Sequence, residues 1–134
     1  IESNAFDSKK RLKSVTLPDT VKFIGSNAFY SCNSLENIQL NEGLETIGSY
    51  AFGYCYALES IEIPDTVKYI SNSVFYYCGA LSKITLPKAL PVIEDNTFEN
   101  CYSLSEIEIP DTVTSISIAK KSLSGWKICT GNLA

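Results

Sequence analysis

The strongest constraint in this sequence is a spacing: the same pattern of residues returns every 23 positions along the chain. A fixed period of about 20 to 50 residues is typical of stacked repeats, in which each unit buries its apolar face only against its neighbours. The spacing therefore predicts a solenoid with one core that runs along the stack. The returning residues are Phe6, Phe29, Phe52, Phe75 and Phe98; Leu12, Leu35, Leu58, Leu81 and Leu104; and Cys32, Cys55, Cys78 and Cys101.

Each unit contains a short stretch in which apolar and polar residues alternate, as in 35–40. This alternation is expected of a half-buried strand, with Leu35, Ile38 and Leu40 pointing inward and Asn37 and Gln39 pointing outward. A proline follows four of these five strands, and proline cannot donate to a β-ladder. A second short extended piece and a helical turn that carries the inward phenylalanine complete the predicted coil.

The unit reads L-x-x-I-x-[IL]-P-x-x-V-x-x-I-x-x-x-A-F-x-x-C-x-x, and over residues 1–116 it resembles the 23-residue leucine-rich repeat of the BspA type. That family is common in bacterial surface proteins. The resemblance implies an α/β, β-rich fold: a leucine-rich-repeat solenoid of about five 23-residue coils, with a stacked parallel sheet and short helical turns. It also implies an extracellular or cell-surface location and adhesion to other macromolecules.

The chain divides into two segments at position 116. Residues 1–116 are predicted to form the solenoid, which opens in the middle of a repeat because Ile1 is equivalent to Ile24; we interpret the chain as a fragment. Residues 117–134 leave the pattern, with Lys121, Ser124 and Lys127 at the phenylalanine, cysteine and leucine positions. This tail is predicted to be a degenerate last repeat, a C-terminal cap with Trp126 as its lid, or a disordered segment.

The charge of the chain narrows the class of partner. The net charge is −4, and no run of lysine or arginine occurs, so nucleic acid and anionic membrane surfaces are not expected partners. No apolar run approaches the roughly 18 residues needed to cross a bilayer, so membrane insertion is not expected. The resemblance to the BspA-type repeat implies that the partner is a protein, including a host or matrix macromolecule.

Metal sites and cofactors are not expected. The sequence has no histidine and no C-x-x-C motif, which argues against zinc. The repeated turn places Asp19, Glu42, Asp65 and Asp111 in one column, but Lys88 interrupts it and the spacing of a calcium loop is missing. These acidic side chains are instead expected to bond to backbone N–H groups of their own turns.

The cysteine ladder is predicted to be a row of buried free thiols that behave as small apolar groups. Equivalent side chains in neighbouring coils point in parallel rather than toward one another, which disfavours disulfides. Cys129 lies outside the ladder and is the one cysteine expected to be exposed.

Catalysis is not predicted. Without histidine, Ser-His and Cys-His nucleophiles cannot form. Glu59 with Glu62, and Glu106 with Glu108, are paired acids, but they fall on the outer side of the predicted strands. A flat sheet offers no cleft to shift their pKa values, so we expect a solvated face.

Two surfaces are candidates for binding a partner protein. The first is the tyrosine-rich turn that follows the buried phenylalanine, because tyrosine is enriched in binding surfaces. The alternative for these tyrosines is that they pack across neighbouring turns and shield the core. The second surface is the outward side of the strands, which becomes more acidic toward the C-terminus. The candidate residues are Tyr54, Tyr56, Tyr76 and Tyr77 in the turns, and Glu62, Lys83, Glu106 and Glu108 on the strands.

Three functional hypotheses follow. The first is a non-enzymatic protein-binding or adhesion domain of a secreted or surface protein, which is the role that the resemblance implies. The second is a structural spacer in a larger surface protein. The third is an accessory repeat region of an enzyme whose catalytic part lies elsewhere.

Overall fold

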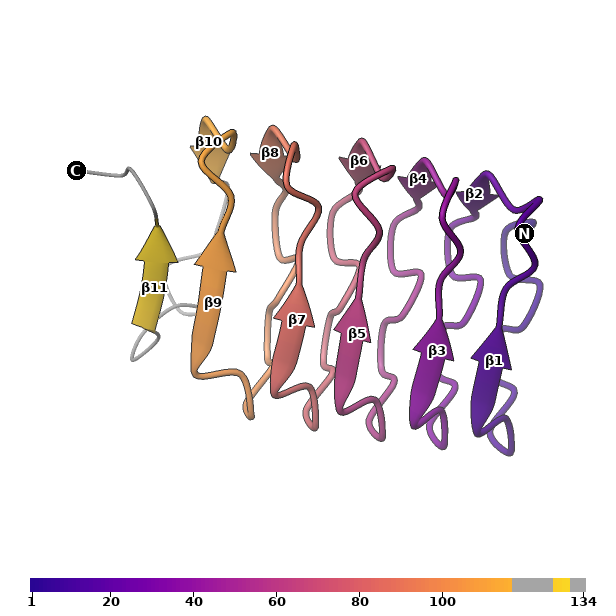
Figure 1. Ribbon diagram of the computed structural model, residues 1–134. Coiled ribbons are helices and arrows are strands. Elements are labelled where there is room, and N and C mark those ends of the chain that lie inside the picture. The colour runs from indigo at the N-terminus through magenta and orange to yellow at the C-terminus, as the bar shows by residue number, and fades with distance from the viewer. Residues whose placement is uncertain (117–126, 131–134) are drawn as a thin grey trace.

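The chain winds into a stack of similar coils, arranged side by side along one axis (Figure 1). The structure, a computed structural model, describes residues 1–116 and 127–130. One row of parallel strands forms the front of the stack, and a second row of two-residue strands lies along its upper edge (Figure 1). The solenoid expected from the repeat is therefore confirmed.

The first row contains β1 (Ser14–Thr16), β3 (Asn37–Gln39), β5 (Ser60–Glu62), β7 (Lys83–Thr85), β9 (Glu106–Ile109) and β11 (Lys127–Thr130). The second row contains β2 (Phe23–Ile24), β4 (Thr46–Ile47), β6 (Tyr69–Ile70), β8 (Val92–Ile93) and β10 (Ser115–Ile116). Strands pair in parallel within each row: β1–β3, β5–β7 and β9–β11 in the first, and β2–β4–β6 and β8–β10 in the second. We refer to the two rows as the first sheet and the second sheet. Up to β10, residues 23 positions apart pair directly, so the period of the sequence is the register of the sheets.

The last strand breaks this register. Lys127 falls at the leucine position of the 23-residue pattern, yet in β11 it pairs with Glu106 of β9. The strand β11 therefore pairs with the first sheet in a shifted alignment. Trp126 lies outside the described residues, and the side chain of Cys129 is not described, so their predicted roles and the boundary at 116 stay predictions.

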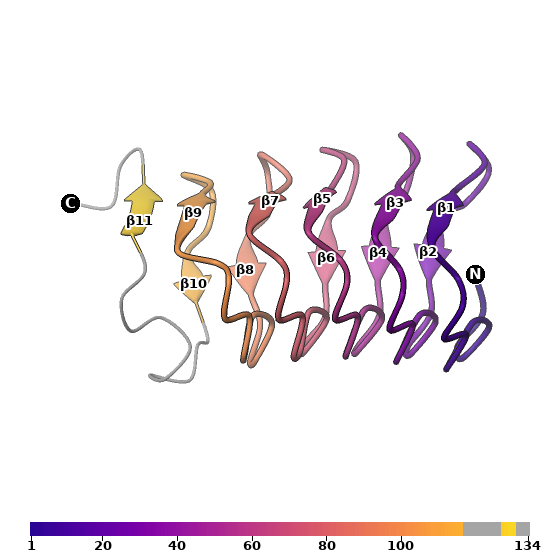
Figure 2. The same ribbon diagram turned by 90° about the horizontal axis from the view of Figure 1, so that it is seen from below.

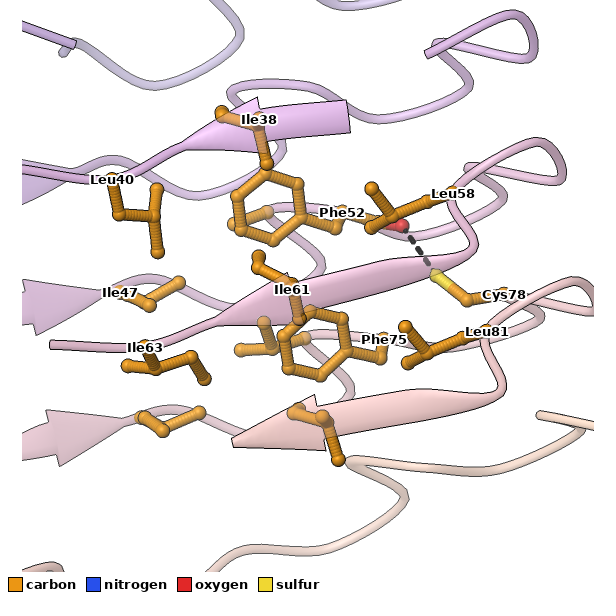
Figure 3. Close-up of a cluster of buried hydrophobic side chains, with 14 of the residues drawn as sticks. Ile38, Leu40, Ile47, Phe52, Leu58, Ile61, Ile63, Phe75, Cys78 and Leu81 are labelled. Carbon is orange, nitrogen blue, oxygen red and sulfur yellow. Dashed lines mark hydrogen bonds between the residues drawn. The ribbon is translucent and has the colours of Figure 1, made fainter. Parts of the chain in front are cut away.

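The core is a set of ladders of side chains at equivalent positions of successive coils, some of one residue type and some of mixed apolar types (Figure 3). Successive phenylalanine rings lie 5.2–5.8 Å apart between centroids and are within 6° of parallel. Phe29, Phe52 and Phe75 are fully buried, as predicted. Phe6 is 38% exposed because its ring has a stacking neighbour on one side only.

The predicted alternation along the first strands is confirmed, although the strands are shorter than expected. In β3 and β5, the central Ile38 and Ile61 are buried while the residues on either side are exposed. Leu35 and Leu40 are buried as predicted but lie outside β3. Burial of these flanking residues therefore depends on packing inside the coil and not on strand pairing.

The helical turn predicted around each phenylalanine is wrong: residues 1–116 and 127–130 contain no helix. Each of these turns holds two non-glycine residues with positive φ, four positions apart, and a right-handed helix does not accommodate such residues. The residues are Asn4 and Ser8, Asn27 and Ser31, Tyr50 and Tyr54, Ser73 and Tyr77, and Asn96 and Asn100.

These turns alternate hydrogen bonds within a coil with bonds between coils. The N–H of Ala28 donates to the carbonyl of Gly25 in its own turn at 3.2 Å. The next N–H, of Phe29, donates to the carbonyl of Ala51 in the following coil at 2.8 Å. Every second turn residue thus forms a hydrogen bond to the neighbouring coil. The segments that connect β2 to β3 and β4 to β5 run parallel to each other (Figure 2).

Candidate functional site

Seven tyrosines form one connected cluster on the turns that precede the first-sheet strands. Tyr54 is at its centre, with ring centroids 5.3 Å from Tyr30, 5.9 Å from Tyr56, 5.6 Å from Tyr76 and 5.2 Å from Tyr77. The structure therefore brings together all four tyrosines predicted as a binding surface. The full tyrosine cluster is Tyr30, Tyr50, Tyr54, Tyr56, Tyr76, Tyr77 and Tyr102.

The alternative that these tyrosines pack across neighbouring turns is confirmed in part, and their role in binding stays a prediction. The rings pack across neighbouring turns, and Tyr54 and Tyr77 stack within 6° of parallel. Yet Tyr56 remains 46% exposed and Tyr102 74% exposed. The tyrosine cluster thus covers the turns and also presents aromatic area to solvent.

Three of the tyrosines occupy a costly backbone conformation. Tyr50, Tyr54 and Tyr77 have φ between 55° and 59°, which bulky side chains rarely adopt. Such a conformation costs on the order of 1–3 kcal/mol per residue and is held only where the surroundings enforce it. The equivalent residues in the other coils are all asparagine or serine: Asn4, Ser8, Asn27, Ser31, Ser73, Asn96 and Asn100.

A glycine, Gly53, lies in the middle of this surface. Five residues at the 23-residue spacing form one column, in the order Asp7, Tyr30, Gly53, Tyr76 and Glu99. A Cβ atom on Gly53 would lie 3.1 Å from Cδ2 of Tyr30 and 3.3 Å from Cδ1 of Tyr50. The absence of a side chain at position 53 therefore lets these two rings lie close against the turn.

A hollow of about 530 Å³ opens among these rings. Tyr30 is edge-on to Tyr50 and Tyr54, at interplanar angles of 74° and 71°. Tyr76 is likewise edge-on to Tyr50 and Tyr54, at 74° and 70°. The walls consequently face in different directions instead of forming one flat stack. The hollow is lined by Asp7, Asn27, Tyr30, Tyr50, Tyr54 and Tyr76.

Three phenols of the tyrosine cluster, those of Tyr54, Tyr76 and Tyr102, have a raised pKa. Desolvation, together with the neighbouring tyrosines, raises the pKa of Tyr54. Desolvation raises the pKa of Tyr76, and the negative charge of Glu99 adds to this effect. At neutral pH these side chains therefore offer O–H donors and uncharged aromatic faces.

The charged candidates lie on the first sheet. All four are exposed: Glu62, Lys83, Glu106 and Glu108. Glu62 pairs with Thr85 across the sheet. The tyrosine-bearing turns run behind the first-sheet strands (Figure 1). The structure thus does not bring the charged candidates together with the tyrosines, and they form a separate surface.

The acidic turn column makes contacts between neighbouring coils. No group of three metal-ligating side chains occurs in the part of the chain that the structure describes. The expectation that these acids bond within their own turn is wrong for Asp65. Its Oδ1 accepts the backbone N–H of Lys88 at 2.9 Å, and its Oδ2 lies 3.7 Å from Lys88 Nζ. Because parallel stacking places equivalent turns next to one another, the nearest donor belongs to the following coil.

The cysteine ladder lies in the core. Cys32, Cys55, Cys78 and Cys101 are buried free thiols, as predicted. Each Sγ donates to the carbonyl of the phenylalanine in the preceding coil at 3.0–3.2 Å, as for Cys78 and Phe52 (Figure 3). Burial raises the pKa of Cys101 to about 12 and that of Cys78 well above its usual value. Since the thiolate is the nucleophile, these cysteines are protected from reaction.

We expect the ladder thiols to resist alkylation in the folded protein. At pH 8, iodoacetamide should leave these four residues unmodified in native buffer and modify all of them in guanidinium chloride, as read by peptide mass spectrometry. Cys129, outside the ladder, is predicted from the sequence to react first. Rapid native modification of Cys55 or Cys78 would contradict the burial described above.

Sequence reasoning missed part of the candidate surface. Asp7, Tyr30, Tyr50 and Gly53 were not among the predicted binding residues, although the 23-residue column that contains three of them could have indicated a gap flanked by tyrosines. It also missed exposed aromatic residues on the second sheet. Phe23 is 46% exposed and Tyr69 is 49% exposed, and the two strands that bear them flank β4.

The described part of the chain contains no helix long and apolar enough to cross a membrane. No curated protein matches the sequence. Solved structures of bacterial leucine-rich repeat proteins are similar to it. One from Bacteroides ovatus has a TM-score of 0.82 and 26% identity, covering 97% of this chain and 39% of the other. One from T. pallidum has a TM-score of 0.77 and 30% identity, covering 85% and 55%.

A third similar structure is a leucine rich cell surface protein from Faecalibacterium prausnitzii, with a TM-score of 0.62 and 28% identity. The alignment covers 99% of this chain and 43% of that one, so this chain spans about half or less of each of these relatives. The sequence profile of the BspA type leucine rich repeat region matches six copies over residues 1–122. This chain belongs to the BspA-type leucine-rich repeat family.

Proposed function

We propose that this chain is a non-enzymatic protein-binding repeat domain of a secreted or cell-surface protein, and that the tyrosine cluster is its contact surface. The observation that carries the proposal is the continuous contact among the seven tyrosines, which span several coils and stay partly open to solvent. Tyrosine supplies rigid, amphipathic contact area with little side-chain entropy to lose on binding.

The backbone beneath the tyrosine cluster supports this assignment. Cross-coil hydrogen bonds hold the turns on both sides of Tyr54, whose N–H donates to the carbonyl of Tyr76 at 2.7 Å. Tyr50, Tyr54 and Tyr77 persist in a conformation that asparagine or serine adopts at less cost. Because the other coils stack with those smaller residues, the stack itself does not need tyrosine at these positions.

A surface location is supported by the relative from Faecalibacterium prausnitzii, which is described as a cell surface protein. Adhesion to a host or matrix protein is the corresponding role. The negative charge of the chain fits a protein partner better than nucleic acid or an anionic membrane.

The test compares two sets of variants for binding to immobilised extracellular matrix proteins. One variant changes Tyr54, Tyr56, Tyr76 and Tyr77 to serine, and the matched control changes Glu62, Glu106 and Glu108 to glutamine. We expect the tyrosine variant to lose binding by at least about tenfold, the effect of removing a central aromatic anchor, and the control to bind as the wild type does. Unfolding in urea should confirm that both variants remain folded.

If the glutamine variant loses binding and the tyrosine variant does not, the contact surface is the first sheet. The exposed face of the first sheet is the second candidate surface, because it is charged; its residues are Glu62, Lys83, Glu106 and Glu108. Binding through this row should weaken strongly with salt, whose screening length is about 8–10 Å at physiological ionic strength. Absence of binding to every matrix protein by the wild type would favour the spacer hypothesis.

A further inference from the structure

The hollow in the tyrosine cluster has the walls of an aromatic cage. Tyr30 and Tyr76 stand on either side of Gly53 in one column, and Tyr50 and Tyr54 flank them from neighbouring positions of the turn. Centroids of the four edge-on ring pairs lie 5.3–6.2 Å apart. Rings set at steep angles around a space present faces and edges to one occupant at the same time.

The size of the hollow fits a side chain of a partner. Its volume of about 530 Å³ is within the range of roughly 300–1,000 Å³ usual for small-ligand sites. That space accommodates one long side chain with part of the peptide that carries it. A whole folded element of a partner would instead need a longer groove.

The charge of the surroundings selects the occupant. Aromatic faces are negative and attract cations, and Asp7 lines the same hollow. Glu99, at the opposite end of the column, is close enough to Tyr76 to raise the pKa of its phenol. Neither lysine nor arginine is among the residues that line the hollow. The two carboxylates would therefore repel an anionic group and attract a cationic one.

We propose that this hollow receives an arginine side chain of a partner protein, with the guanidinium against the tyrosine rings and Asp7 as its counter-charge. This inference rests on the proposed function and makes the partner's chemistry specific. Arginine fits better than lysine because its guanidinium is planar, is weakly hydrated and stacks on aromatic faces. Lysine would have to give up a tightly held hydration shell to enter the same space.

The test uses a defined probe, the peptide acetyl-Gly-Arg-Gly-Arg-Gly-amide. Its matched control replaces both arginines with citrulline, which is neutral and has almost the same shape. Binding is followed through the NMR shifts of ¹³C-labelled tyrosines. We expect the arginine peptide to shift the rings around the hollow and to bind about tenfold more tightly than the citrulline peptide, as cation–π attraction in a partly desolvated site allows.

Variants locate the site. Tyr30→Leu and Tyr76→Leu should each weaken the arginine peptide by about fivefold or more, whereas Tyr30→Phe keeps the ring and should retain most of the binding. Gly53→Ala should also weaken it, because the new methyl would press on the ring of Tyr30. Tyr69→Leu is the matched control, since Tyr69 lies on β6 and outside the tyrosine cluster.

A pair of charge variants tests the counter-charge. Asp7→Asn should weaken the peptide several-fold, while Glu108→Gln on the first sheet should leave its affinity unchanged. Equal affinity for the arginine and citrulline peptides would overturn the proposal, as would equal losses in Tyr30→Leu and Tyr69→Leu. Larger tyrosine shifts with maltotetraose than with the arginine peptide would point to a carbohydrate site and would also overturn it.

The two proposals fail in different ways. If the four-tyrosine variant loses matrix proteins while the wild type ignores the arginine peptide, the contact surface stands and the arginine assignment is wrong. If the four-tyrosine variant binds matrix proteins with the same affinity as the wild type, the tyrosine cluster is not the contact surface, and the proposed function of this surface is wrong.

Discussion

Replacing Phe52 with alanine is expected to lower the free energy of unfolding by about 3–5 kcal/mol, the usual range for truncating a buried aromatic residue. Phe52 is fully buried, and its ring lies 5.5 Å from Phe29 and 5.6 Å from Phe75. In a stacked repeat, most stability comes from contacts between neighbouring coils, and this substitution removes contacts on both sides at once. Urea unfolding followed by circular dichroism measures the change.

Two other phenylalanines are controls for this experiment. Phe6→Ala should cost less, because Phe6 is 38% exposed and stacks on one ring only. Phe23→Ala should stay within about 1 kcal/mol of the wild type, since Phe23 is 46% exposed on the second sheet. A loss below about 1 kcal/mol for Phe52→Ala would mean that the ladder does not carry the core.

Alkaline pH is expected to unfold the protein through the cysteine ladder. Burial raises the folded-state pKa of Cys101 from 9.0 to about 12, and it also raises those of Cys55 and Cys78. The stability that each protonated thiol contributes is fully present below pH 9, the unfolded value. It is lost as the pH rises from about 9 toward the folded-state pKa, because the unfolded chain releases the proton first.

The expected slope is a loss of about 1.4 kcal/mol per pH unit for each buried thiol, or about 4 kcal/mol in total for Cys101. Urea midpoints measured between pH 7 and pH 11 give this slope. Cys101→Ala is the matched variant. It should be less stable than the wild type at pH 7, but above pH 9 its free energy of unfolding should fall by about 1.4 kcal/mol less per pH unit, because one buried thiol is missing. Identical slopes for the two proteins would show that the Cys101 thiol does not drive the alkaline transition.

Much of the coil is predictable because a repeat turns a local pattern into a long-range one. Residues with the same role, such as Ile24 and Ile47, are 23 positions apart and pair directly in the structure. Once the coil length is fixed, every inward position stacks on its own equivalent. That is why burial of Phe52, Cys55 and Ile61 could be predicted from spacing alone.

The turn around each phenylalanine could not be predicted in the same way. Asn27 and Ser31 adopt positive φ, and the N–H groups between the strands bond partly to the next coil. Intrinsic propensity describes a residue in its own segment, whereas here the carbonyls of the following turn supply the acceptors. The same is true of Asp65, whose hydrogen-bond partner was expected within its own turn and lies in the next coil.

The sequence by itself determined the architecture of this protein, because an apolar residue at every inward position of a 23-residue period has one way to be buried: against its own copies. It also determined the row of free thiols in the core. Only the tertiary structure decided the shape of the tyrosine surface. Whether the tyrosines scatter or converge depends on the backbone angles of Tyr50, Tyr54 and Tyr77, which contacts between coils determine. The sequence supplies the glycine at position 53, but only the structure shows that the rings of Tyr30 and Tyr50 occupy the space beside it.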